Sequence, residues 1–141
     1  MSEPHMDLAS GIAAFEAKEF RRALQLLTPL AEDGDADAQF RLAIMCQNGL
    51  GRVASETQAL HWMQASAGQD HGLALHGLGV MYLYGECVNK DESEALKCFR
   101  RAADQGLAGS LTTLAMMYQE GMGVEKDPAH AQELYRQAGF E

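Results

Sequence analysis

The 141-residue sequence has few positive charges and no long apolar run. Its 11 lysines and arginines are outnumbered by 20 aspartates and glutamates, which gives a formal net charge of −9 at pH 7. A protein that binds nucleic acid or an anionic membrane surface needs a basic face. A membrane-spanning helix needs roughly 20 consecutive apolar residues, and no stretch approaches that length. We therefore expect no nucleic-acid partner and no membrane partner.

Cysteine is scarce as well. The three cysteines at 46, 87 and 98 form no spaced framework for disulfides or metal, and an odd number is typical of a reducing compartment. The N-terminus lacks the basic and then apolar segments of a signal peptide, although a signal already trimmed off would leave no trace. We expect a cytoplasmic protein in which residues 1–7 form a disordered leader.

Motifs for catalysis and cofactor binding are missing too. There is no Gly-x-Ser-x-Gly elbow, no phosphate-binding loop and no paired carboxylates outside helix caps. The Gly-x-Gly loops at 49–51 and 121–123 follow predicted helices, whereas a nucleotide loop follows a strand. His71 and His76 are five residues apart, which is poor spacing for sharing one helical face. We expect no enzyme activity, no metal and no cofactor.

What the sequence does contain is one segment written three times. Copies begin at Leu42, Leu78 and Leu114, at a constant spacing of 36 residues. A fixed period of this size is typical of stacked helical repeats. The three copies cover residues 35–70, 71–106 and 107–141, and residues 8–34 predict a shorter opening helix pair.

Each copy predicts two helices. The first helices, near 35–48, 71–84 and 107–120, each end at a glycine, which favours the left-handed conformation found at helix ends. Ser55, Asp91 and Asp127 are good N-cap residues for the second helices. Alanine recurs in the second helices at 59, 95 and 131 and allows a close approach between the two helices of a pair. One pair cannot bury its apolar face alone, so stacking supplies the core.

These residues resemble the Sel-1-like repeat, a relative of the tetratricopeptide repeat. The match in the third copy consists of Leu114, Tyr118, Gly121, Gly123, Val124, Asp127, Ala131 and Tyr135. Departures are Cys46 for the usual tyrosine, Cys87 for the second loop glycine, and Val53 one place late. The resemblance implies an all-α, right-handed α-α superhelix of four helix pairs, eight helices in all, in a single repeat domain over residues 8–141 with a tetratricopeptide-like opening pair at 8–34. It also implies an adaptor or scaffold that binds another protein.

By analogy with tetratricopeptide grooves, the first helix of each pair lines a concave face that would receive a peptide or helix of the partner. Two interpretations of the residues at these positions stay open: they line a groove, or they pack together inside a tightly wound short array. The candidates are Phe15, Phe40, Ile44, Gln47, Asn48, His76, Val80, Leu83, Tyr84, Thr112, Met116, Gln119 and Glu120.

Two other functions compete with the adaptor. An array normally ends in a polar capping helix, but this one ends with Leu134, Tyr135 and Phe140, so the last helix pair would allow self-assembly, for example as a homodimer. A weaker alternative is a regulatory subunit with a small ligand near His76 and Tyr84.

Overall fold

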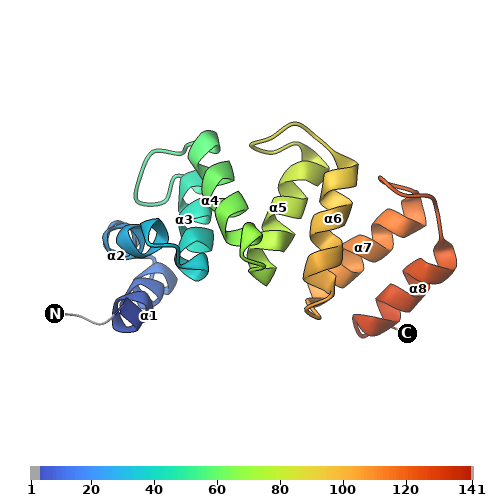
Figure 1. The fold of residues 1–141 in the computed structure, drawn as a ribbon, viewed down its shortest axis with the longest axis horizontal. Coiled ribbons are helices and arrows are strands. Elements are labelled where there is room, and N and C mark those ends of the chain that lie inside the picture. The colour runs from blue at the N-terminus through green and yellow to red at the C-terminus, as the bar shows by residue number, and fades with distance from the viewer. Residues whose placement is uncertain (1–3, 141) are drawn as a thin grey trace. The chain divides into compact units, whose positions relative to one another are not determined.

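The structure, a computed structural model, describes the backbone of residues 4–140 and the side chains of residues 7–140. This part of the chain forms eight helices and contains no strand (Figure 1). The all-α fold of four helix pairs predicted from the sequence is confirmed. The helices are α1 (Pro4–Glu16), α2 (Phe20–Glu32), α3 (Ala36–Asn48), α4 (Glu56–Gly68), α5 (Gly72–Tyr84), α6 (Glu92–Ala103), α7 (Ala108–Glu120) and α8 (Pro128–Gln137).

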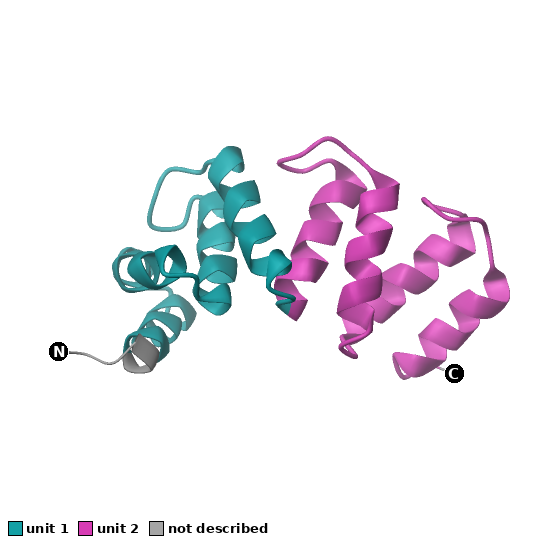
Figure 2. Ribbon diagram, viewed as in Figure 1, with its two compact units in different colours: residues 1–71 teal, residues 72–141 magenta. Residues whose placement is uncertain are grey.

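The chain divides into two compact units, residues 1–71 and 72–141 (Figure 2). Unit 1 holds α1 to α4, and each of its helices packs against the next one along the chain. Unit 2 holds α5 to α8 with the same neighbour-to-neighbour packing. Each unit is therefore a stack of two helix pairs. The single repeat domain and the handedness of its superhelix stay predictions.

The first helix begins earlier than the sequence suggested. Because α1 starts at Pro4, the prediction of a disordered leader over residues 1–7 is wrong for residues 4–7, and residues 1–3 lie outside the described residues. Proline suits the first turn of a helix, where its missing N–H would have had no intrahelical partner. Asp7 adds a negative charge in that first turn, which the helix dipole favours.

Helix boundaries in the three copies follow local signals. The side chains of Ser55, Asp91 and Asp127 each accept the backbone N–H three residues later, at 3.3, 3.1 and 3.1 Å. The helices α3 and α7 end at Gly49 and Gly121, whose φ angles of 66° and 70° lie in the left-handed region that glycine tolerates best. These caps confirm the predicted boundaries to within one residue.

The core of each unit is built around a recurring alanine in the second helices. Ala23, Ala59, Ala95 and Ala131 follow one another at the 36-residue spacing, and none is more than 2% exposed. A methyl group at the helix crossing permits the shorter separations between helix axes. A larger side chain stands four residues after each alanine: Leu27, Met63, Phe99 and Tyr135.

Gly79 makes room for the largest of these side chains. A Cβ at this position of α5 would lie 2.8 Å from Cζ of Phe99, and Phe99 is fully buried, so its ring has nowhere to move. Replacing glycine by alanine inside a helix normally stabilises by up to about 1 kcal/mol, whereas overpacking a core costs about 1–3 kcal/mol. We expect Gly79→Ala to lower the free energy of unfolding by about 1 kcal/mol, as measured by urea denaturation.

Gly68→Ala in α4 is the matched control, because a Cβ there meets nothing within 4 Å. It should leave the free energy of unfolding unchanged or raise it by up to about 1 kcal/mol. If Gly79→Ala were as stable as Gly68→Ala, tight packing of Gly79 on Phe99 would be disproved.

Candidate partner-binding faces

In unit 1, one side of α3 stays accessible. The buried residues of this helix, such as Ala38 and Leu42, alternate with a stripe of half-buried or exposed residues at helical spacing. We call this stripe the α3 face. It consists of Asp37, Phe40, Arg41, Ile44, Gln47 and Asn48.

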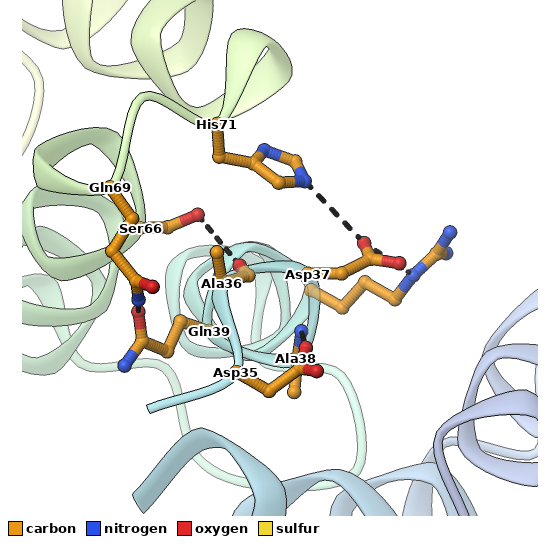
Figure 3. Close-up of polar contacts among 9 residues, drawn as sticks. Asp35, Ala36, Asp37, Ala38, Gln39, Ser66, Gln69 and His71 are labelled. Carbon is orange, nitrogen blue, oxygen red and sulfur yellow. Dashed lines mark hydrogen bonds and ion pairs between the residues drawn. The ribbon is translucent and has the colours of Figure 1, made fainter. Parts of the chain in front are cut away.

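Side chains of the α3 face hold one another in place. The ring of Phe40 stacks on His71, with 5.1 Å between ring centroids. The Asp37 carboxylate lies 3.3 Å from Nε of Arg41 and 3.6 Å from Nε2 of His71 (Figure 3). The Arg41 guanidinium in turn sits 5.1 Å from the centre of the Phe15 ring. Aromatic, cationic and anionic groups thus share one pre-ordered surface.

These partly exposed contacts order side chains more than they stabilise the fold. The Asp37 and Arg41 side chains are 34% and 18% exposed, and ion pairs at such positions contribute only about 0–1 kcal/mol. The same contacts can strengthen the binding of a partner, because side chains already held in one geometry lose less conformational entropy on binding.

A buried polar network anchors α3 from behind. Ser66 in α4 donates to the carbonyl of Ala36 at 2.7 Å. The Gln39 amide donates to the carbonyl of Ala31 at 3.0 Å. Its side-chain oxygen accepts from Gln69 at 3.0 Å (Figure 3). Buried amides and hydroxyls require such partners, so this network fixes the start of α3 against α2 and α4.

Sequence reasoning missed this network, although the repeat pattern contained a signal. Gln39 occupies the position of Leu75 and Leu111 in the other two copies, and Ser66 occupies that of Ala102. A polar residue where the other copies are apolar indicates a local partner, because an unpartnered buried polar group is costly.

In unit 2, His76 is engaged in packing. Its Nδ1 lies 2.8 Å from Oγ of Ser110, and its ring makes an edge contact with Phe99 at 5.2 Å. Burial lowers the pKa of His76, so the imidazole is neutral at pH 7. It links α5 to α7 and has little left to offer a partner.

Tyr84 is an exposed aromatic side chain among the candidates. It ends α5 and is 63% exposed. One turn away, Val80 is half-buried and packs against the core, as does Met116 of α7. Tyr84, Val80 and Met116 define what we call the unit 2 face.

The other candidates divide by burial. The prediction that Leu83 lies on an accessible face was wrong. This side chain is 1% exposed, because it packs in the core cluster of unit 2 with residues of α6. Gln47 and Thr112 are half-buried, and Asn48, Gln119 and Glu120 are exposed. Three of these side chains already form hydrogen bonds within their unit. Asn48 donates to the Ile44 carbonyl, Thr112 donates to the Gly109 carbonyl, and Gln119 accepts from the Tyr135 hydroxyl.

Unit 2 also has a cleft beside α8, which we call the α8 cleft. Its volume is about 470 Å³. Tyr135 and Phe140 make an edge-to-face contact on one side, with 6.3 Å between ring centroids, and the Tyr135 hydroxyl donates to Gln119 at 3.2 Å. The lining residues are Gln119, Pro128, Ala131, Gln132, Tyr135, Arg136 and Phe140.

Other kinds of site are not evident in the part of the chain that is described. No cluster of three or more His, Cys, Asp or Glu residues there could hold a metal ion. None of its helices is both long and apolar enough to cross a bilayer. Burial raises the pKa of Cys98 to about 11 and also raises that of Cys46, so both thiols are protonated and unreactive at neutral pH.

The lowered pKa of His76 predicts a pH-dependent stability. Because protonation is easier in the unfolded chain than in the folded one, stability is complete above the unfolded pKa of about 6.5 and declines as the pH falls below it. We expect the wild-type protein to lose more thermal stability between pH 7.5 and pH 5 than His76→Gln, which cannot titrate. Equal losses in melting temperature for the two proteins would contradict the burial of a neutral His76.

A family model described as Sel1 repeat matches residues 36–71, 72–107 and 110–139. No curated protein matches the chain at a significant level. Among solved structures, a Sel1 repeat protein from Oxalobacter formigenes is 28% identical with a TM-score of 0.89, over 94% of this chain and 53% of that one. A protective antigen of uropathogenic Escherichia coli displaying an SLR fold is 32% identical with a TM-score of 0.90, over 96% of this chain and 30% of that one.

A third structure, the cysteine-rich protein B of Helicobacter pylori, is 18% identical with a TM-score of 0.66, over 85% of this chain and 86% of that one, and shows a shared fold alone. The chain spans about half the length of the first relative and under a third of the second. The opening pair, α1 and α2, lies outside the matched residues. The remaining three pairs carry three consecutive copies of the repeat, and the chain belongs to the Sel1 repeat family.

Proposed function

We propose that this chain is a non-catalytic adaptor that binds a peptide or helix of a partner protein on its first-helix faces. Sel1 repeat proteins generally mediate protein–protein interaction. The α3 face and the unit 2 face are the surfaces we assign to this role. Each mixes apolar and polar side chains, as the face that receives an amphipathic helix or an extended peptide does.

The observation that carries the proposal is the ordering of the α3 face. Phe40 is stacked on His71, Arg41 lies over Phe15, and the Asp37 carboxylate lies 3.3 Å from Arg41 and 3.6 Å from His71. Side chains that are already ordered lose less conformational entropy when a partner binds. Aromatic and arginine side chains are also the residues that most often dominate binding energy at protein interfaces.

The remaining expectations are part of the same proposal. We assign no nucleic-acid partner and no membrane partner, supported by the acidic net charge of −9. We assign no catalytic role, supported by the lack of a catalytic motif in the sequence. We propose a cytoplasmic location, supported by the odd number of cysteines, which is typical of a reducing compartment. A small ligand near His76 and Tyr84 is less well supported, because His76 already bonds to Ser110.

Self-assembly is the second candidate function, and the α8 cleft favours it. Phe140 is 58% exposed beside this cleft, and an exposed aromatic group next to a hollow is a feature of surfaces that pair. A homodimer formed there would show a concentration-dependent mass in sedimentation that Phe140→Ala abolishes.

The adaptor is tested by affinity capture with paired variants. Tyr84→Ala and Phe40→Ala remove accessible aromatic groups from the unit 2 face and the α3 face. We expect the amount of a captured partner to fall at least tenfold for one of them, since removing an interface hot spot costs about 2 kcal/mol or more. Quantitative mass spectrometry of the captured proteins measures this.

Val53→Ala is the matched control. Val53 is 86% exposed in the loop between α3 and α4, so the substitution trims an exposed apolar side chain that belongs to neither face. Capture should be unchanged by Val53→Ala. A partner that is held equally by both face variants but lost with Val53→Ala would move the binding site to the loops.

A further inference from the structure

One pair of neighbouring positions in α3 reverses the order of apolar and polar residues that the other copies show. In the second and third copies, a buried leucine precedes a half-buried polar residue. In α3 the buried position holds Gln39, which is 6% exposed, and the half-buried position holds the aromatic ring of Phe40. The corresponding pairs in α5 and α7 are Leu75–His76 and Leu111–Thr112.

Apolar burial alone does not explain this reversed order. The hydrophobic effect is non-directional and grows with the apolar area removed from water. Rotating the first two turns of α3 so that Phe40 faced inward would bury a large ring and return the Gln39 amide to water. The other buried side chains of these turns are Ala38, Leu42 and Ala43. Two of these three are single methyl groups, which form only shallow ridges and restrict the rotation of the helix weakly.

Hydrogen bonds supply the direction that apolar burial lacks. The Gln39 amide donates to the Ala31 carbonyl of α2 at 3.0 Å. Its oxygen accepts from Gln69, the C-cap residue of α4, at 3.0 Å (Figure 3). Gln69 also donates to the Gly34 carbonyl, in the turn between α2 and α3, at 2.8 Å. Gln39 thus joins α2 to the end of α4, and rotation of α3 would break both of its bonds.

The inward position of Gln39 leaves Phe40 on the α3 face, since successive residues of a helix lie about 100° apart around its axis. There the Phe40 ring stacks on His71, with 5.1 Å between ring centroids. A leucine at position 39 would form no directional bond. It would then compete for burial with Phe40, an apolar residue of larger area.

We propose that Gln39 is a positioning residue of the α3 face, because its buried amide selects the one packing of α3 in which the Phe40 ring stays accessible to a partner. The bonds of Gln39 add little net stability, since folding exchanges bonds to water for bonds within the protein. A buried polar residue that specifies one packing at little gain in stability also occurs in coiled coils. The inference rests on the proposed function only for the use that a partner makes of the α3 face.

Gln39→Leu, which introduces the residue of the other copies, tests this role. The urea midpoint should stay the same or rise, because replacing a buried hydrogen-bonded group by an apolar one of similar size is nearly neutral. NMR of the full chain should show doubled or broadened signals for the Phe40 ring and the Ile44 methyl groups. The NOE between the rings of Phe40 and His71 should weaken.

Two further variants separate positioning from a general loss of packing. Gln39→Leu combined with Phe40→Thr recreates the pair found in α7, so the Ile44 methyl groups should return to a single sharp set of signals. Gln64→Leu makes the same substitution at an exposed position of α4. It should leave the signals of Phe40 and Ile44 as they are in the wild type.

Three results would overturn the proposal. Single, sharp signals for Phe40 and Ile44 in Gln39→Leu would mean that burial alone places the ring. Doubled signals that persist after Phe40→Thr is added would mean that Phe40 is not the competitor. A clear fall in the urea midpoint of Gln39→Leu would reduce the network to a stabilising contact. These measurements need no partner, so a failed capture with Phe40→Ala would contradict the adaptor and leave the role of Gln39 intact.

Discussion

Close packing at one alanine position governs the rest of this structure. Ala23, Ala59, Ala95 and Ala131 are almost fully buried, one in the second helix of each pair. A larger side chain there would push the helices apart, and the bulky neighbours four residues later would no longer fit. The two helices of a pair pack together through their buried residues, so the half-buried and exposed residues of the first helix take no part in that contact. The candidate binding faces are a consequence of how the pairs close.

Much of the fold could be predicted from the sequence because its determinants are local and repeated. The cap residues Ser55, Asp91 and Asp127 and the terminal glycines act within one helical turn, and three copies in register report the same boundaries. The start of α1 was missed because Pro4 was taken as part of a leader, whereas proline is also a favoured first residue of a helix. No repeat copy existed there to correct the interpretation.

The candidate site was predictable only in part. Helical spacing identified a stripe of α3 that is accessible in the structure, but it also placed Leu83 on an accessible face, although this side chain packs in the core of unit 2. Spacing also could not show that Phe40 stacks on His71, or that Arg41 lies over Phe15, because these contacts join residues from different helices and loops. The sequence did single out Tyr135 and Phe140, yet only the structure shows that both line a cleft together with Gln119 of α7.

The central claim is that partners bind on the first-helix faces, and methyl NMR tests it most directly. Ile44 on the α3 face and Val80 and Met116 on the unit 2 face carry reporter methyl groups, while Val53 and Val124 report on the loops. Adding a captured partner should shift the resonances of the face methyls on at least one unit and leave the loop valines unchanged. Shifts confined to Val53 and Val124 would contradict the claim, because binding would then occur at the loops.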